Sequence, residues 1–446
     1  MANYRVYMCF LHVEMGHKNC KQKNSPLQHV VAHAVVEECV TSPPVVSPPN
    51  IIEPVKVVKF APTAYPLGRA KSSLEPQKSA ISHFVARSKS MPLPVRRRAD
   101  IDLPDETLEE VKVLQQALGR KLGPGECIKE EKISEWFEKN TLVHAFGAQS
   151  LSGSPFQARA VSGSKLPNNV GVSCLKGSKG ANDTGPNQDN FSVTVIKGGW
   201  EIYCVLDGHG GGGHYVSFRG IKSLVYFVCN SKNFPANIHA AIMDGFRACQ
   251  ADLLMHSVGN GYDIQISGAA AVLVVRNAET VWVAHTGDSR VVLGNPNSTS
   301  ANFETVDHKP THPTEKIRLE SEGAEIHTFS FENGAVEIAR VFVKGSDYPG
   351  LCMSRSLGDV SVKACGVSAV PDITKGDIKS DDYLILATDG VWEFISSKLV
   401  TGTFSRKLAN EGTHKCLNRI VTEAKKQWKT NEGNYCDDIT AMLIRL

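Results

Sequence analysis

The residues best placed for chemistry are a carboxylate, a backbone carbonyl and an imidazole in consecutive positions, Asp207, Gly208 and His209. The apolar run 202–206 precedes them and further glycines follow. This pattern predicts a buried strand that ends in a tight turn, with the Asp207 carboxylate at the turn. Glycine lets the backbone approach an ion closely. The corner could therefore hold a metal ion, and a carboxylate that only caps its turn is the alternative.

Four other acidic positions lie in the same setting, next to a strand-like run. Clustered carboxylates repel one another unless a cation neutralises them. Ligands that are all oxygen favour Mg²⁺ or Mn²⁺ over Zn²⁺, and two such ions can activate a water for attack on phosphorus. We therefore predict that these acids converge at one end of two packed sheets, while each could instead cap a turn. They are Asp189 before run 191–196, Asp288 between runs 281–285 and 290–293, Asp389 after run 383–388, and Asp437 before run 439–444.

Length, composition and charge are those of a soluble globular protein. The chain has 446 residues, of which 41% are hydrophobic and 21% charged, and its net charge of +3 is too small to argue for a nucleic-acid partner. Its twelve cysteines form no CxxC pair, which predicts reduced thiols and a cytoplasmic or nuclear location. No run approaches the roughly 20 apolar residues of a membrane span. Because no oligomerisation signal is visible, we expect a monomer.

The chain divides into four predicted regions. Residues 1–100 are interrupted by prolines and rich in Ser and Lys, which predicts a flexible extension. Leucines at helical spacing predict a short helical prefix at 101–146, which either packs on the main domain or binds a partner. Gly, Ser and Pro are frequent at 147–169, a predicted linker. Residues 170–446 have the pattern of one compact domain.

Within 170–446, strand-like runs follow one another through short turns, as between Val275 and Val281. This favours antiparallel hairpins over a regular βαβ alternation. Helical stretches are expected between some of the strands. The expected strands are 191–196, 202–206, 270–275, 281–285, 290–293, 383–388 and 439–444, and the expected helices are 214–229, 238–254, 313–321 and 414–430.

The region 170–446 resembles the metal-dependent serine/threonine phosphatases of the 2C type, the PPM family. The resemblance is carried by a series of motifs that keep the order of the family. They are PNQDNF at 186–191, VLDGHGG at 205–211, SGAAAVLVV at 267–275, VAHTGDSRVVL at 283–293, DHKPTHPTEKIRLESEGAEI at 307–326, LCMSRSLGDV at 351–360, VPDI at 370–373, LILATDGVWEFIS at 384–396 and CDDITAMLI at 436–444.

The resemblance implies an α+β fold, in which a central sandwich of two antiparallel β-sheets is flanked by α-helices in four layers. It also implies an active site with two ions, Mg²⁺ or Mn²⁺. Asp207 would bridge both ions, and the Gly208 carbonyl would bind one of them. Asp389 and Asp437 would hold the other, and Asp189 would support the site through water.

Members of the family often bind a third ion, whose ligands would be Asp288, Asp389 and Glu393. The implied reaction is hydrolysis of phosphoserine or phosphothreonine in a phosphoprotein by the metal-activated water, with no phosphoenzyme intermediate. His209 would protonate the leaving seryl or threonyl oxygen, a task that suits an imidazole near neutral pH. Asp359 lies where the family places an acid near the metals.

The sequence departs from the family at the phosphate-binding arginine. Thr184 occupies the expected position, and either Lys179 or Lys176 could replace the arginine as a point charge, although both could equally be solvated loop lysines. The stretch 326–350 should form a variable flap, from which Arg340 could contact the phosphoprotein or remain solvated. A catalytically weak or silent phosphatase-like scaffold or regulator is the alternative function. The presence of Asp207 and the other main acids favours an active enzyme.

Overall fold

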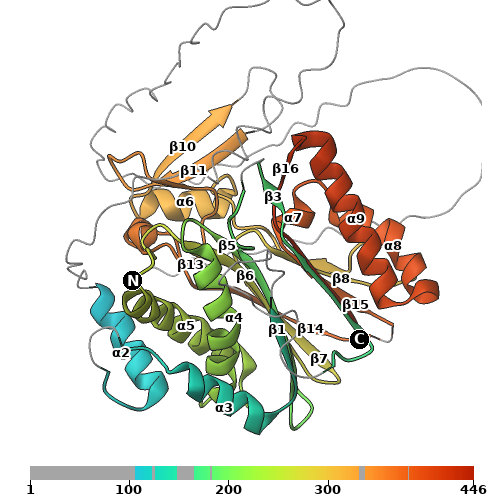
Figure 1. Cartoon of the computed structure of the whole chain (residues 1–446), viewed down its shortest axis with the longest axis horizontal. Coiled ribbons are helices and arrows are strands. Elements are labelled where there is room, and N and C mark those ends of the chain that lie inside the picture. Colours follow the sequence, from blue (N-terminus) through green and yellow to red (C-terminus); the bar gives the residue numbers. More distant parts are fainter. Residues whose placement is uncertain (1–105, 123–125, 148–164, 181–182, 331–336, 380) are drawn as a thin grey trace, which may run out of the picture. The chain divides into compact units, whose positions relative to one another are not determined.

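The protein folds around two antiparallel β-sheets that lie between layers of helices (Figure 1). The computed structural model describes residues 106–122, 126–147, 165–180, 183–330, 337–379 and 381–446. The α+β sandwich expected from the sequence is confirmed. The predicted extension 1–100, and residues 148–164 of the predicted linker, lie outside the described residues. Among the described helices, none has the length and apolar character needed to cross a membrane.

The larger sheet has seven strands, in the order β1-β4-β5-β6-β7-β14, with β13 paired to β6. All its pairings are antiparallel. Because Asp189 pairs with Asp207 in register, these two acids lie side by side at one end of the sheet. The strands are β1 (Thr141–Gly147), β4 (Asp189–Ile196), β5 (Glu201–His209), β6 (Gly268–Arg276), β7 (Thr280–Thr286), β13 (Leu357–Gly358) and β14 (Asp372–Asp377).

The smaller sheet has five strands, in the order β2-β17-β15-β8-β9. The antiparallel register pairs Ala387, at the end of β15, with Arg290 at the start of β8 and with Ala441 near the start of β17. The loops that follow β15 and precede β8 and β17 therefore meet at one end of this sheet. The strands are β2 (Val170–Leu175), β8 (Arg290–Gly294), β9 (Phe303–Glu304), β15 (Tyr383–Ala387) and β17 (Ile439–Arg445).

The central strands are buried on both faces, which explains why they are apolar throughout instead of alternating with polar residues. In β6, Val272 and Val274 pack against the second sheet, while Leu273 and Val275 pack against helices. Successive side chains of a strand point to opposite faces, so both sets are buried. Full burial of each such side chain contributes about 1.5–3 kcal/mol to the free energy of unfolding.

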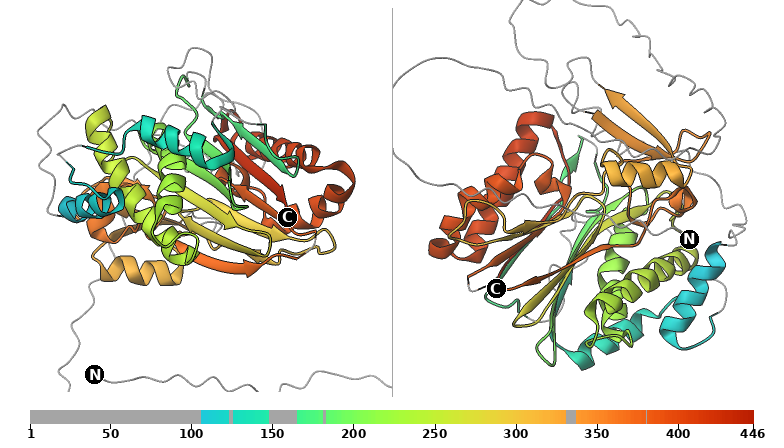
Figure 2. Two further views of the ribbon diagram at one scale, coloured as in Figure 1. Left: turned by 90° about the horizontal axis from the view of Figure 1, so that it is seen from below. Right: turned by 180° about the vertical axis from the view of Figure 1, so that it is seen from behind.

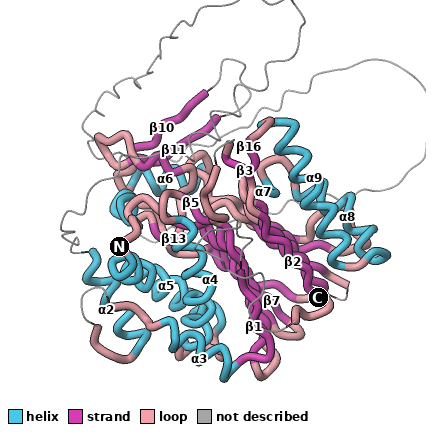
Figure 3. Tube along the Cα trace, in the orientation of Figure 1, coloured by secondary structure: helices cyan, strands magenta, loops and turns pink. Residues whose placement is uncertain are grey.

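Helices cover the outer face of each sheet, as Figure 2 shows from two further directions. The arrangement is also clear when the chain is coloured by secondary structure (Figure 3). On the larger sheet lie α3 (Glu130–Asn140), α4 (Gly213–Asn230) and α5 (Ile238–Asn260), and α2 (Glu106–Leu118) packs against α5. On the smaller sheet lie α7 (Asp389–Trp392), α8 (Ser397–Glu411) and α9 (Thr413–Glu432).

A third, three-stranded sheet corresponds to the predicted flap. It contains β10 (Glu325–Ser330), β11 (Glu337–Phe342) and β12 (Pro349–Leu351), next to α6 (Pro313–Ser321) and the 3₁₀ helix η1 (Val360–Cys365) in sequence. Arg340 is 6% exposed and donates a hydrogen bond to the Gly350 carbonyl. Its guanidinium therefore links two strands of the flap. This differs from the expectation from the sequence, in which Arg340 contacts the phosphoprotein or remains solvated.

The larger sheet begins earlier in the chain than the sequence predicted. Strand β1, which includes residues assigned to the helical prefix 101–146, pairs with β4 along the sheet edge. Ile133 and Phe137 of α3 are buried in the same core as α4 and α5. Residues 126–147 thus pack as part of the domain, and a boundary at residue 170 places its first strand too late.

Candidate active site

Three acids from three different strand ends converge at one end of the sandwich. Asp207 lies near the end of β5, Asp288 in the turn between β7 and β8, and Asp389 directly after β15 at the start of α7. Each offers a carboxylate oxygen, and these oxygens lie within 4.8 Å of one another. Asp288 is 1% and Asp389 4% exposed. The convergence predicted from the strand-end pattern is therefore present for these three acids.

Glycines let the backbone close around these acids. A Cβ on Gly208 would lie 2.3 Å from the Gly213 carbonyl oxygen, because the β5–α4 turn folds tightly against itself. Gly287 has a φ of +92°, and a Cβ there would lie 2.6 Å from the Ala270 Cβ. Side chains at these positions would force the backbone apart, so glycine is needed to bring Asp207 and Asp288 together.

The oxygen-only donor set fits a hard divalent cation. Asp189, which is 1% exposed, supports this view from the adjacent position in the sheet. Burial, together with the charges of Asp438 and Asp437, raises the pKa of Asp189 well above its usual range. Its carboxylate also accepts a 2.9 Å hydrogen bond from Thr388 Oγ1. Asp189 therefore adds a buried carboxyl group directly beside Asp207.

Two other predicted ligands, Asp437 and Glu393, do not belong to that three-acid group in the described part of the chain. Asp437 precedes β17 and forms an ion pair with Lys179, at 3.2 Å between Nζ and Oδ1. Glu393 is exposed one turn after Asp389, and its backbone N–H donates to the Asp389 carbonyl at 2.8 Å. Asp437 thus lies at the same end of the sheets as the three acids, and its carboxylate is paired with Lys179.

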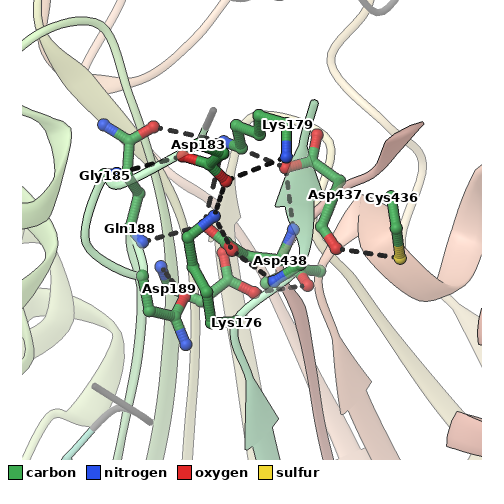
Figure 4. Close-up of polar contacts among 12 residues, drawn as sticks. Lys176, Lys179, Asp183, Gly185, Gln188, Asp189, Cys436, Asp437 and Asp438 are labelled. Carbon is green, nitrogen blue, oxygen red and sulfur yellow. Dashed lines mark hydrogen bonds and ion pairs between the residues drawn. The ribbon is translucent and has the colours of Figure 1, made fainter. Parts of the chain in front are cut away.

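A short two-stranded ribbon brings both candidate lysines to this end of the sheets. It pairs β3 (Ser178–Lys179) with β16 (Tyr435–Cys436). Figure 4 shows Lys176 and Lys179 pointing toward Asp437 and Asp438. Gly177 between them has no room for a side chain, because a Cβ would lie 2.2 Å from the Asp437 carbonyl oxygen.

The two lysines differ in how firmly they are held. Lys176 is 3% exposed, with Nζ 2.6 Å from Asp183 Oδ2 and 3.4 Å from Asp438 Oδ1. Lys179 is 20% exposed, and Nζ also donates to Gln188 Oε1 at 3.3 Å. Burial opposes the charge on Lys179, but the carboxylates of Asp437 and Asp438 outweigh it and raise its pKa well above the usual range. Lys179 is therefore a charged group that remains partly accessible.

Asp438 fixes the loop that carries these residues. Its carboxylate accepts hydrogen bonds from the backbone N–H groups of Gly177, at 2.7 Å, and Gln188, at 2.9 Å. With Lys176, these contacts satisfy a side chain that is only 2% exposed. The sequence shows two adjacent acids at 437–438, but it does not reveal that Asp438 accepts hydrogen bonds that fix the loop.

His209 lies at the end of β5, two residues after Asp207, and its Nε2 is 2.7 Å from Asp359 Oδ2. Asp359 is 1% exposed, between β13 and η1. Burial acts to raise the pKa of Asp359, but the charge and hydrogen bond of His209, with Lys363 and Ser356, lower it overall. Asp359 was expected near the metals, and the structure places its carboxylate against the imidazole.

Asp288 has a cationic neighbour that the sequence did not single out. The ammonium of Lys309, in the DHKP segment, forms an ion pair with Asp288 Oδ2. The lysine side chain is 34% exposed, so its charge is partly solvated. Only the folded chain brings this lysine, on the loop before α6, to the turn between β7 and β8.

A second group of possible metal ligands, His285, His308 and Asp372, has a structural explanation. The two imidazoles stack with centroids 4.3 Å apart and an interplanar angle of 9°. His308 Nδ1 accepts from the Gly287 N–H at 3.2 Å, which leaves Nε2–H to donate to Asp372. In-plane lone pairs of parallel rings do not converge on one ion, so this group fits stacking and hydrogen bonding better than coordination.

Comparison with known proteins assigns the family. A family model described as "Protein phosphatase 2C" matches residues 176–433, which is more than half of the chain. The chain is 32% identical over 287 residues to "Probable protein phosphatase 2C 34" of Arabidopsis thaliana, covering 59% of this chain and 77% of the relative. It is 29% identical over 351 residues to "Probable protein phosphatase 2C 73" of the same organism, covering 71% and 86%.

The fold is also similar to that of a solved structure, the serine-threonine phosphatase 2C from Toxoplasma gondii. The TM-score is 0.51 at 21% identity, over 62% of this chain and 94% of the other. At that identity the similarity concerns the fold, and it agrees with the sandwich seen here. Together with the match to the family model, these findings show that the chain belongs to the protein phosphatase 2C family and is a protein serine/threonine phosphatase.

Proposed function

We propose that the enzyme hydrolyses phosphoserine and phosphothreonine in proteins with Mg²⁺ or Mn²⁺ and without a phosphoenzyme intermediate. The observation that carries this proposal is the group of Asp207, Asp288 and Asp389, whose carboxylate oxygens lie within 4.8 Å of one another beside His209. Mutually repelling carboxylates of this kind are typical of a site for divalent cations.

The proposed metal centre uses two ions, with a third ion beside them. Asp207 and the Gly208 carbonyl would hold them together with Asp389 and Asp437, and Asp189 would act through water. Asp288 and Glu393 would join Asp389 around a third ion. When bound, the ions would supply Lewis acidity and a water activated for attack on phosphorus.

The chain's own side chains would handle the proton and the phosphate. His209 would donate a proton to the leaving oxygen, and its position next to Asp207 supports this role. For the phosphate, the structure favours Lys179 over Lys176. Lys176 is held by Asp183 and Asp438 and is 3% exposed, whereas Lys179 is 20% exposed. Moving Lys179 from Asp437 to a substrate phosphate would exchange one anionic partner for another.

Phosphate release from a phosphothreonine peptide tests this proposal. After dialysis against a chelator, the enzyme should be inactive until Mn²⁺ or Mg²⁺ is added. Asp207→Asn should lower the rate by at least about 100-fold, since even residues that only orient a metal ligand contribute 10–100-fold. Asp244→Asn is the matched control and should leave the rate unchanged. Asp244 lies near the start of α5, where it accepts hydrogen bonds from Ser231 and Asn233.

A catalytically silent scaffold predicts another outcome of the same assay. The folded protein would release no phosphate with either ion, and Asp207→Asn would change nothing. A rate that persists in the presence of chelator would contradict the metal-dependent mechanism itself.

A further inference from the structure

The contact between His209 and Asp359 joins the site to a buried polar chain that the proposed metal chemistry does not use. His209 Nε2 is 2.7 Å from Asp359 Oδ2, and the imidazole side chain is 19% exposed. The other ring nitrogen, Nδ1, is buried and has no hydrogen-bond partner among the described residues. The only hydrogen-bond partner of the ring among the described residues is thus the Asp359 carboxylate, which fixes its orientation.

Asp359 is itself held firmly. Its Oδ2 accepts a 2.5 Å hydrogen bond from Ser356 Oγ, and its backbone N–H donates to the Ser267 carbonyl at 2.9 Å. The ammonium of Lys363, a half-buried residue, donates to the Ser356 carbonyl at 2.8 Å and to Ser356 Oγ at 3.3 Å. Gly268 makes room for the carboxylate, because a Cβ there would lie 2.1 Å from Asp359 Oδ2.

The backbone of Asp359 indicates that this geometry is maintained at a cost. Its φ of +47° lies in the left-handed region, which typically costs a residue other than glycine about 1–3 kcal/mol. Such conformations persist where the surrounding contacts fix them, and here those contacts orient the carboxylate toward His209.

We propose that Asp359 is a positioning residue, which holds the His209 imidazole through Nε2 and so fixes the orientation in which the ring protonates the leaving seryl or threonyl oxygen. This inference rests on the proposed hydrolysis and assigns Asp359 to the proton donor instead of the metal centre. Among the described residues, Asp359 is not part of the group formed by Asp207, Asp288 and Asp389. Its Oδ2 is already engaged by His209 and Ser356.

The proton transfer balances in this arrangement. The protonated imidazole gives one proton to the oxygen of the breaking P–O bond, while that oxygen keeps the bonding electron pair and leaves as the alcohol. The neutral ring then takes up a proton from solvent water, and its contact with Asp359 preserves its orientation for the next turnover. No proton needs to pass to Asp359.

The dependence of the rate on the leaving group tests the proposal. Asp359→Asn keeps the size of the side chain but removes the charge that fixes the ring. With a phosphoserine peptide, whose leaving alkoxide needs a proton, kcat should fall by about 100-fold, within the 10²–10⁴-fold range of a proton donor. With 2,4-dinitrophenyl phosphate, whose leaving group is stable as an anion, kcat should change by less than about 3-fold. KM for the peptide should stay close to that of the wild type.

The chain offers a matched control in its other histidine–aspartate contact. Asp372→Asn removes the carboxylate that lies 3.2 Å from His308 Nε2, in the structural group described above. It should change the rates on the two esters by the same small factor. Ser356→Ala, which removes only the hydroxyl bound to Asp359, should give a smaller loss than Asp359→Asn with the same preference for the poor leaving group.

A double-mutant cycle separates positioning from general damage. In a His209→Ala background, Asp359→Asn should cause no further loss, since residues that act through one another are not additive. Equal losses on both esters, or a full additional loss in the His209→Ala background, would overturn the proposal. If the wild type hydrolysed neither ester with Mn²⁺, the hydrolytic function would fail instead. If Asp359→Asn does not fold, Ser356→Ala, alone and in the His209→Ala background, decides on the same criteria.

Discussion

Lys176 and Lys179 are three residues apart, but their surroundings predict different consequences of removing their charges. Lys179→Met should mainly raise KM for a phosphopeptide, by about 10-fold or more, because a charged hydrogen bond contributes about 1.5–3 kcal/mol. Its partner Asp437 is 8% exposed and would also lose its counter-charge. Steady-state kinetics with a phosphothreonine peptide measure this effect.

Lys176→Met, three residues earlier in the chain, is the comparison. It should lower the free energy of unfolding by about 3 kcal/mol, because Asp183 and the buried Asp438 lose the cation they share, and Asp438 keeps only Lys179 at 3.7 Å. Denaturant unfolding would show the difference between the two variants. The assignment of Lys179 to the phosphate would be wrong if Lys179→Met had unchanged KM, or if the two variants raised KM equally.

The positions of single site residues could be predicted from the sequence where the residue and its immediate neighbours form a recognisable pattern. An acid after an apolar run and before glycine pointed to Asp207 and Asp389, and both lie at strand ends as expected. The partners of these residues were not predictable in the same way. Asp359 meets His209 across 150 positions of the chain, and Lys179 meets Asp437 only because β3 pairs with β16.

At the scale of elements, the strands that the sequence predicted are those with apolar residues on both faces. Strands β5, β6 and β15 are buried almost throughout, so hydrophobic runs marked them. Strand β14 was not predicted, because it lies at the edge of the larger sheet with most of its side chains exposed or half-buried. Its residues DITKGD show neither an apolar run nor an alternation.

An ion-pair network fastens the segment before α3 to the helices of the larger sheet. Arg219 of α4, which is 2% exposed, binds both carboxylate oxygens of Asp252 of α5, at 2.8 and 2.9 Å. The same guanidinium donates to the Ile128 carbonyl at 2.6 Å and to Glu130 at 2.9 Å. It therefore links α4, α5 and the residues that lead into α3.

This network predicts unequal effects of two conservative substitutions. Asp252→Asn should lower the free energy of unfolding by about 3–5 kcal/mol, because it leaves the buried Arg219 charge without its main partner. Glu130→Gln should lower it by less, since the Glu130 side chain is 46% exposed and its loss leaves Arg219 paired with Asp252, although the buried Lys222 also loses its anionic partner. Denaturant unfolding of both variants measures the difference, and equal losses would contradict this account of the network.

At the scale of the whole molecule, two sheets with antiparallel pairing bring distant acids to one place. The ends of β5 and β15 and the starts of β8 and β17 lie at the same end of the sandwich, so residues from 207 to 437 can share a site. The nine cysteines in the described residues are all free thiols. The cytoplasmic or nuclear location and the monomeric state stay predictions.

If the converging acids form the metal centre, the folded protein should bind Mn²⁺ whether or not a substrate is present, so binding can be measured without catalysis. Free Mn²⁺, measured by electron paramagnetic resonance during titration of the folded protein, should show about two ions taken up by the wild type. Asp389→Asn should weaken this uptake by at least about 100-fold, whereas Asp244→Asn should leave it unchanged. Uptake by Asp389→Asn equal to that of the wild type would contradict the account.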